Sequence, residues 1–229
     1  MQIAGLVKTS LIDYPGKVAA VVFTQGCNFR CGFCHNPDLI EVGEGILSED
    51  EIFEFLKTRQ GKLDGVVITG GEPLVQPDIM AFIIKVRALG YLIKLDTNGS
   101  NPKVLGSLTE GHLIDYIAMD IKGPRSKYAD ICAYSNTKVI QQSIKIIKSS
   151  GLDYEFRTTV LPHFHEADDF DGIGKLIAGA KLYTIQGFRP QITLDPALKQ
   201  ENSFTYLQLE GIAKVMAPYV EKVVIHANL

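Results

Sequence analysis

The chain has 229 residues, of which 46% are hydrophobic and 9% are aromatic, so it can bury a full-sized core as one domain spanning residues 1–229. Its 23 lysines and arginines are outnumbered by 26 aspartates and glutamates, and the formal charge of −3 excludes the basic surface that binds nucleic-acid phosphates. No stretch approaches the ~18 apolar residues of a membrane helix and no signal-peptide pattern is present, so we expect a cytoplasmic protein with neither nucleic acid nor membrane as partner.

Short apolar runs followed by turn residues predict seven β-strands, and stretches with helical periodicity lie between them. In chain order the strands are expected at residues 18–24, 65–69, 91–95, 114–120, 154–160, 182–186 and 222–226. The helices are expected at 48–59, 77–89, 102–111, 138–149, 168–178 and 204–216, of which the third has the weakest pattern. Ser48 followed by Glu51 forms a capping box that marks the start of the first helix.

The alternation of strand and helix predicts an α/β fold with a parallel sheet and right-handed crossovers. About six βα units are too few for a closed eight-stranded barrel, so the expected fold is an incomplete (β/α)6-type barrel with parallel strands. Ligands of such folds bind in the loops that follow the carboxyl ends of the strands. The polar residues that follow successive strands should therefore meet on one rim.

The loop after the first predicted strand holds three of the four cysteines within eight residues. Cys27, Cys31 and Cys34 have C-x3-C-x2-C spacing, which is too tight and too odd in number for a disulfide framework and indicates a metal site. Zinc would need a fourth ligand, which only His35 or Cys132 could supply. Attached haem would use the C-x-x-C-H segment and leave Cys27 unexplained. Three thiolates can instead hold three irons of a cubane cluster and leave the fourth iron open to another ligand.

Further polar segments lie at the ends of the next three strands and on the fifth strand. They are Gly70-Gly71-Glu72-Pro73, Asp96-Thr97-Asn98-Gly99, Asp120-Ile121-Lys122 and Glu155-Phe156-Arg157-Thr158. Paired glycines allow a close backbone approach, and the carboxylate of Glu72 can accept hydrogen bonds from an ammonium group. Gly and Pro alone would also suit a tight turn, and Asn98-Gly99 is a common turn dipeptide.

The C-x3-C-x2-C motif followed by His35-Asn36-Pro37, together with the rim segments, resembles the radical S-adenosylmethionine (radical SAM) superfamily over most of the chain. The resemblance implies that the three cysteines hold a [4Fe-4S] cluster whose open iron binds S-adenosylmethionine (SAM). An electron from the cluster would break a sulfur–carbon bond and yield methionine and a 5′-deoxyadenosyl radical. The chain is therefore expected to be an oxidoreductase of this superfamily.

The resemblance also implies which residues contact the cofactor. They are Phe33, His35, Gly70, Gly71, Glu72, Asp96, Asp120, Lys122 and Arg157. Phe33 would lie against the adenine, Glu72 would bind the amino group and Lys122 would face the carboxylate. Asp96 and Asp120 would also help to hold a monovalent cation near that carboxylate. The simpler alternatives are a core aromatic for Phe33 and a strand-end cation for Arg157.

Residues 9–17 (Thr-Ser-Leu-Ile-Asp-Tyr-Pro-Gly-Lys) and 34–37 are similar to glycyl radical enzyme activating enzymes, in particular those of anaerobic ribonucleoside-triphosphate reductase. The similarity implies that a glycine of this reductase loses a hydrogen atom to the deoxyadenosyl radical, and that a flavodoxin- or ferredoxin-type protein donates the electron. Two alternatives stay open: a radical SAM enzyme acting on a metabolite, as 7-carboxy-7-deazaguanine synthase does, and a non-enzymatic binding or electron-transfer protein. His163 and His165 are expected to be exposed, and Cys132 to be a core residue without a role.

Overall fold

The computed structural model describes residues 1–43 and 45–227, and its strands form one sheet in the order β1 to β8. The strands are β1 (Ile3–Ser10), β2 (Ala19–Thr24), β3 (Gly65–Gly70), β4 (Leu92–Thr97), β5 (Tyr116–Asp120), β6 (Asp153–Val160), β7 (Tyr183–Gly187) and β8 (Val223–His226). Neighbours from β2 to β8 pair in parallel, whereas β1 pairs antiparallel with β2. The incomplete (β/α)6-type barrel is confirmed, with one antiparallel edge strand that the sequence did not predict.

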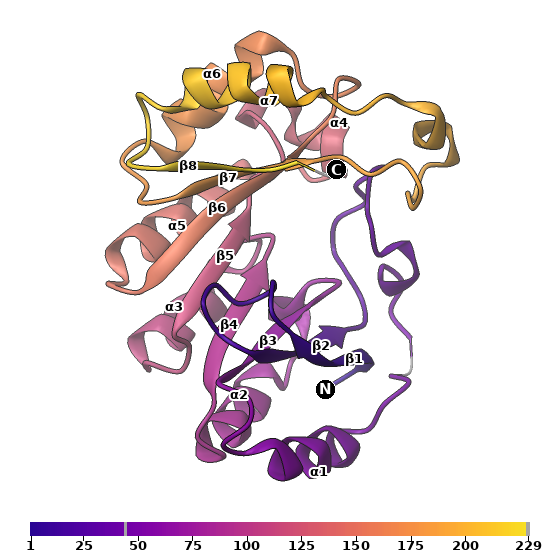
Figure 1. Ribbon diagram of the computed structural model, residues 1–229, viewed down its shortest axis with the longest axis vertical. Helices are drawn as coiled ribbons and strands as arrows, with labels where there is room; N and C mark the ends of the chain where they lie inside the picture. The colour runs from indigo at the N-terminus through magenta and orange to yellow at the C-terminus, as the bar shows by residue number, and fades with distance from the viewer. Residues whose placement is uncertain (44, 228–229) are drawn as a thin grey trace.

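The helices connect successive strands and cover one face of the curved sheet (Figure 1). They are α1 (Glu49–Arg59), α2 (Ile79–Ala88), α3 (Pro102–Glu110), α4 (Tyr128–Cys132), α5 (Thr137–Ser149), α6 (Ala167–Ile177) and α7 (Tyr206–Met216). Each of the predicted strands and helices is found within two residues of its expected bounds. The capping box of Ser48 and Glu51 is formed at the start of α1. No described helix is both long and apolar enough to cross a lipid bilayer.

The two elements that the sequence did not predict are β1 and α4. β1 lies at the edge of the sheet and leaves Val7 and its two following residues exposed, so it lacks the apolar pattern of an inner strand. α4 has only five residues, which is too short for a periodic pattern to develop.

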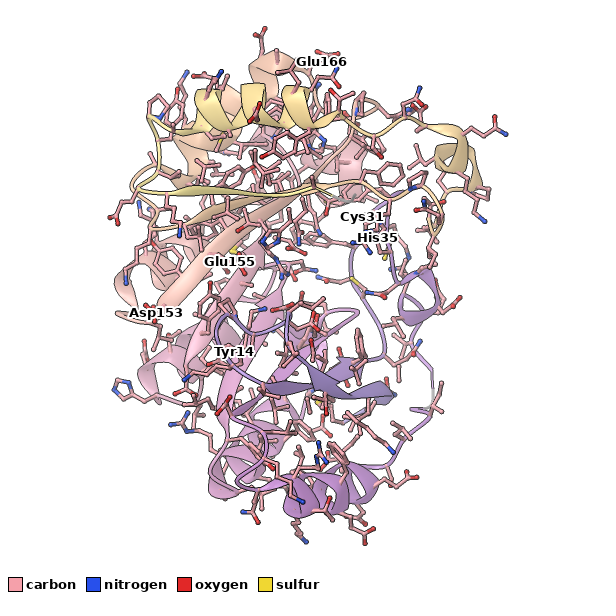
Figure 2. The ribbon with its side chains drawn as sticks, viewed as in Figure 1. Tyr14, Cys31, His35, Asp153, Glu155 and Glu166 are labelled. Atoms are coloured by element: carbon pink, nitrogen blue, oxygen red, sulfur yellow. The ribbon has the colours of Figure 1, made fainter. Side chains whose placement is uncertain are left out.

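Strand alternation gives the sheet two different faces. Ile93 and Leu95 of β4 are fully buried in the main core under the helices, whereas the alternate residues Lys94 and Asp96 point to the opposite side. We call that opposite side the inner face. Figure 1 shows that the long loops after β2 and β7 lie on this side of the molecule. In Figure 2, Cys31 and His35 lie there as well.

Candidate active site

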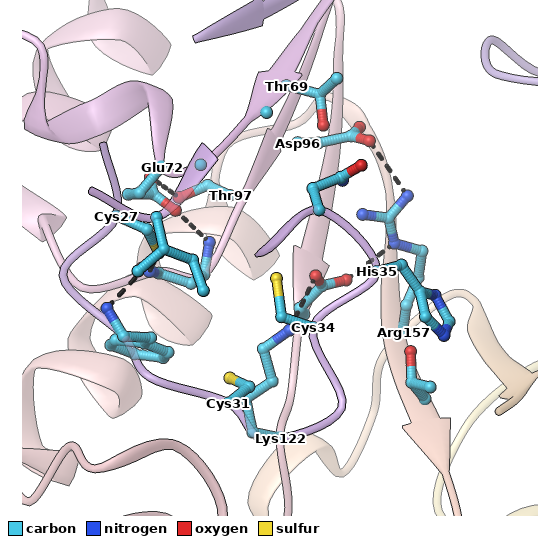
Figure 3. A pocket seen from close by; sticks show the side chains of 18 of the residues that line it. Cys27, Cys31, Cys34, His35, Thr69, Glu72, Asp96, Thr97, Lys122 and Arg157 are labelled. Carbon is cyan, nitrogen blue, oxygen red and sulfur yellow. Dashed lines mark hydrogen bonds and ion pairs between the residues drawn. The ribbon is translucent and has the colours of Figure 1, made fainter. Parts of the chain in front are cut away.

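A cavity of about 370 Å³ opens on the inner face, at the carboxyl ends of the strands (Figure 3). Its wall includes all twelve residues that the sequence singles out: Cys27, Cys31, Phe33, Cys34, His35, Gly70, Gly71, Glu72, Asp96, Asp120, Lys122 and Arg157. The structure thus brings together residues from a span of 131 positions in the sequence, 27 to 157. Their individual roles stay predictions.

The cysteine loop, residues 27–34, is held in place by backbone hydrogen bonds. The N–H of Cys27 donates to the carbonyl of Ile40 at 2.9 Å, which closes the base of the loop. The N–H of Arg30 donates to the carbonyl of Cys132 at 2.9 Å, which ties the middle of the loop to the end of α4. These bonds join backbone atoms, so they do not depend on the identity of the side chains in the loop.

The three thiols are neutral at pH 7 in the metal-free chain. Burial raises the pKa of Cys27 to about 11 and also raises that of Cys34, while a hydrogen bond with Cys132, followed by burial, raises that of Cys31. Within the described part of the chain, no three Cys, His, Asp or Glu side chains converge as the ligands of a single metal ion do. Thiolates that each bind a different iron of a cubane cluster need not converge in that way, so the donor set suits such a cluster.

The two glycines at the end of β3 are required by contact with the backbone between β2 and the cysteine loop. A Cβ on Gly71 would lie 2.2 Å from the carbonyl oxygen of Gly26, and a Cβ on Gly70, whose φ is +117°, would lie 2.3 Å from the nitrogen of Thr24. The N–H of Glu72 donates to the same carbonyl of Gly26 at 2.9 Å. The close backbone approach expected from the glycines is therefore made, and within the protein it is made to Thr24 and Gly26, directly before the cysteine loop.

The carboxylate of Glu72 is 1% exposed and accepts three hydrogen bonds from the protein. The donors are the hydroxyl of Thr97 at 2.6 Å, the N–H of Asn98 at 2.6 Å and the N–H of Leu74 at 3.0 Å. Burial raises its pKa to about 7, although these bonds act in the opposite direction. Glu72 thus fastens the loop after β4 to the loop after β3, and its further contact with an ammonium group stays a prediction.

Five charged side chains alternate in sign across the inner face of β4, β5 and β6. They run in the order Lys94, Asp96, Arg157, Asp120, Lys122. Arg157 joins the two carboxylates, with Nη1 3.2 Å from Asp96 Oδ2 and Nε 2.9 Å from Asp120 Oδ1. Lys122 Nζ lies 3.1 Å from Asp120 Oδ2, and Lys94 Nζ pairs with Asp96 Oδ1. We call this set the charge chain.

Asp120, Lys122 and Arg157 keep one another ionised despite their burial. Although burial alone would raise it, the neighbouring Arg157 and Lys122 hold the pKa of Asp120 well below its usual range. Burial alone would lower the pKa of Lys122 and of Arg157, yet Asp120 holds both above their usual ranges. The cavity therefore presents fixed cationic groups at neutral pH, as recognition of a carboxylate requires.

Phe33 and His35 contribute aromatic rings to the cavity wall. The Phe33 ring is buried, with its centroid 5.8 Å from that of Phe164 and 5.9 Å from Lys122 Nζ. His35 Nε2 accepts a hydrogen bond from the N–H of Arg189 at 3.3 Å, and burial lowers its pKa, so its ring is neutral at pH 7. A flat neutral wall of this kind suits an aromatic base, and the adenine contact of Phe33 stays a prediction.

Sequence reasoning missed several residues that build the site. Lys94 could have been found from strand alternation, since it is a polar residue at an inward position of a buried strand. Asn98, assigned only to a turn, places its amide nitrogen 3.0 Å from Asn28 Oδ1 and 4.0 Å from Cys27 Sγ. No local pattern indicates the contact of Asn98 with the cysteine loop.

The expectation for His165 was wrong, because this side chain is only 2% exposed. Its Nε2 lies 2.9 Å from the carbonyl oxygen of Lys122, and its Nδ1 accepts from the N–H of Leu161 at 3.4 Å. His163, by contrast, is exposed and pairs with Glu201 at 3.1 Å. His165 thus fixes the backbone of Lys122 from behind the cavity.

The comparison with known protein families decides the identity of this site. The radical SAM superfamily matches residues 21–176, which include the cysteine loop and the whole charge chain. The chain belongs to the radical SAM superfamily. This superfamily implies a [4Fe-4S] cluster and SAM, and the donor set on the cavity wall fits both. The chain is therefore a radical SAM enzyme.

Two relatives by sequence carry related descriptions. A putative glycyl-radical enzyme activating enzyme of Methanocaldococcus jannaschii is 34% identical, and the match covers 97% of this chain and 95% of the relative. A pyruvate formate-lyase-activating enzyme of Listeria monocytogenes is 32% identical over 56% of each chain. The first match spans nearly the whole of both chains and places them in one family within the superfamily.

A more distant sequence match is the 7-carboxy-7-deazaguanine synthase of Koribacter versatilis, which is 33% identical over 63% of this chain and 62% of its own. Among solved structures, Streptococcus suis SuiB bound to precursor peptide SuiA aligns with a TM-score of 0.71 at 13% identity. That alignment covers 90% of this chain and 48% of SuiB. At this identity the likeness concerns the fold alone.

Proposed function

We propose that this radical SAM enzyme activates a glycyl radical enzyme by removing a hydrogen atom from one glycine of its partner. The observation that carries the proposal is the meeting of three thiols with the paired side chains of Asp120, Lys122 and Arg157 on the wall of one cavity. The match to the M. jannaschii activating enzyme over nearly the whole chain supports the choice of partner class.

Each part of the cavity wall has a task in this proposal. Cys27, Cys31 and Cys34 would hold three irons of the cluster, and each must lose a proton to do so because its thiol is neutral beforehand. Arg157 and Lys122 would orient the carboxylate of SAM. When bound, the cluster and SAM together supply a 5′-deoxyadenosyl radical.

A second cavity supports a bulky substrate. Its volume is about 450 Å³, and it shares His35, Thr159 and Gln186 with the first cavity. The loop after β7 contributes Arg189 and Ile192 to its wall. A loop of a partner protein could therefore lie in the second cavity while its tip reaches the first, and His35 would stand at the junction.

The finer assignments follow from the sequence resemblance. We propose anaerobic ribonucleoside-triphosphate reductase as the partner and a flavodoxin- or ferredoxin-type protein as the electron donor. Both would bind this chain, as a single domain, in the cytoplasm. A monovalent cation beside Asp96 and Asp120 also stays a prediction of that resemblance. The four oxygens of these two carboxylates are each bound by a cationic side chain.

Electron paramagnetic resonance on the anaerobically reconstituted enzyme tests the proposed function. With reductant, SAM and the reductase, we expect a glycine-centred doublet in the reductase and an equal amount of 5′-deoxyadenosine. Reductase whose radical-bearing glycine is replaced by alanine is the control and should give no doublet. Formation of 5′-deoxyadenosine without a doublet in this or another glycyl radical enzyme would reject the proposal.

The alternative substrate is a metabolite, which the distant match to 7-carboxy-7-deazaguanine synthase favours. The second cavity could hold a small molecule as well as a peptide loop. Consumption of a small-molecule substrate with release of 5′-deoxyadenosine, and with no doublet in any glycyl radical enzyme, would establish the alternative.

A further inference from the structure

Lys94 is a buried cation that the proposed function leaves without a task. Its side chain is 2% exposed, and it does not contribute to the wall of the cavity. Its ammonium pairs with Asp96 Oδ1 and lies 5.9 Å from the centre of the Tyr116 ring. Burying an ammonium group costs free energy unless the group is paired. The burial of the Lys94 ammonium behind the cavity therefore indicates a role for its charge.

Neighbouring tyrosines cover the side chain of Lys94 on the inner face of the sheet. Lys94 stands opposite Tyr116 in the register of β4 and β5, and the ring of Tyr14 lies 6.0 Å from that of Tyr116. Tyr14 belongs to the loop between β1 and β2, which covers the lower end of the inner face (Figure 2). The ammonium is therefore shut off from solvent on the side away from Asp96.

The next register position explains how the charge chain crosses the sheet. Asp96 stands opposite Ala118, and Asp120 stands opposite Arg157. Because Ala118 has a small side chain, the guanidinium of Arg157 can reach over β5 from β6 to Asp96 on β4. Each of the four carboxylate oxygens thereby has a cationic partner: Lys94 and Arg157 bind the two oxygens of Asp96, and Arg157 and Lys122 bind those of Asp120.

This arrangement does not fit a metal cation. Hard cations such as Na⁺ and K⁺ need oxygen ligands, and the carboxylate oxygens here are already engaged by protein donors. A metal cation between Asp96 and Asp120 would also lie beside the guanidinium of Arg157 and be repelled by it.

We propose that the ammonium of Lys94 takes the place of a monovalent metal cation, so that this enzyme binds SAM without Na⁺ or K⁺. The charge chain has three cations and two anions, and its net charge of 3 − 2 = +1 matches one cofactor carboxylate. Without Lys94 the sum is 2 − 2 = 0, and an external cation would be needed to restore it. Lys94 is then a positioning residue that holds Asp96, and through it Arg157, toward SAM. The proposal rests on SAM binding in this cavity.

The test is SAM binding by calorimetry to anaerobically reconstituted protein in chloride salts of Na⁺, K⁺ or choline at one ionic strength. For the wild type we expect dissociation constants equal within about twofold in the three salts. For Lys94→Met we expect binding about tenfold weaker in choline and largely recovered in Na⁺ or K⁺. Lys85→Met, which removes an exposed lysine of α2, is the matched control and should behave as the wild type.

Two results would overturn the proposal: a wild type that needs Na⁺ or K⁺ for binding, or a Lys94→Met variant whose binding does not respond to them. If Lys94→Met does not fold, Lys94→Met combined with Asp96→Asn removes both charges and keeps the sum at +1. This double variant should bind SAM equally in all three salts, and a dependence on Na⁺ or K⁺ would contradict the proposal. Because no partner protein is present, failure to form a glycyl radical leaves this test unaffected.

Discussion

The inner face of the sheet has an apolar half and a charged half. On β2 and β3 the inward residues include Val21 and Val67, which belong to a small apolar cluster. On β4 to β6 the corresponding positions carry Lys94, Asp96 and Arg157, which belong to the charge chain. The cysteine loop follows the apolar half, and the groups that can recognise an amino acid lie on the charged half.

The two halves fix their functional groups by different means. Backbone hydrogen bonds hold the cysteine loop, so most side-chain changes there should leave its course intact. In the charged half each side chain is held by its neighbours of opposite sign, so removing one member releases the next. We therefore expect a substitution in the cysteine loop to leave the positions of its neighbours unchanged, whereas a substitution in the charge chain should displace the neighbouring charged side chains as well.

The largest expected effect tests the first half of this comparison. Cys27→Ala, Cys31→Ala and Cys34→Ala should each lose the cluster and bring SAM cleavage to background, because each would remove the ligand of one iron. Iron and sulfide content together with release of 5′-deoxyadenosine measure this. Cys132→Ala is the control, since Cys132 is buried behind the loop, and it should keep both properties. Cleavage that survives in any of the three ligand variants would disprove the cluster assignment.

The next effect tests whether the charge chain acts as a unit. Arg157→Met leaves Asp96 and Asp120 buried with one partner fewer each, so the free energy of unfolding should fall by about 3 kcal/mol. Urea unfolding measures this loss, and SAM affinity should fall with it. Arg87→Met removes the more exposed pair with Asp115 and should cost less than about 1 kcal/mol. Equal losses of unfolding free energy in the two variants would show that Arg157 contributes no more to stability than an exposed ion pair does.

A third prediction concerns Glu72, which joins the two halves. Glu72→Gln turns one accepting oxygen into a donor that faces another donor, so it should lower the free energy of unfolding by about 2 kcal/mol at pH 8. Urea unfolding compares the variant with Glu51→Gln, whose carboxylate also accepts a hydrogen bond from a backbone N–H but is exposed.

The same carboxyl predicts a pH dependence of stability. Its pKa is about 7 in the folded chain against an ordinary value of 4.5, so the folded state binds more protons between these pH values. Its stabilising contribution is complete below pH 4.5 and is lost as the pH rises through 7. The unfolding free energy of the wild type should thus fall relative to that of Glu72→Gln over this range. A parallel pH profile for the two proteins would contradict this assignment.

The smallest expected effect concerns His165, which supports Lys122 at the end of the charge chain. His165→Phe removes the hydrogen bond to the carbonyl of Lys122, which should cost about 1 kcal/mol of stability and weaken SAM binding a few-fold. Thermal unfolding and calorimetry measure the two quantities. His163→Phe, at the exposed neighbouring histidine, should change neither. If the two variants behave alike, His165 does not position Lys122.

Much of this protein follows from local sequence. Apolar runs and helical periodicity predicted every inner strand and the longer helices, because those patterns record burial on one or both faces of an element. The rule that ligands bind after the carboxyl ends of parallel strands selected the segments after four strands, and the family resemblance added residues such as Phe33 and Arg157; all twelve line one cavity. The edge strand β1 escaped prediction because its residues 7–9 are exposed and interrupt the apolar run that marks the other strands.

Tertiary structure alone decided which partner each of these residues takes. The sequence indicates that Glu72, Asp96 and Asp120 are acids on one rim, but their oxygens are bound by Thr97, Arg157 and other donors that lie on different strands. Such pairings depend on strand register and on a small residue at the crossing point, neither of which is encoded within a few positions of the acid. The sequence by itself therefore determined the chemistry of the cavity, and only the packed sheet determined which of its charges are free to meet a ligand.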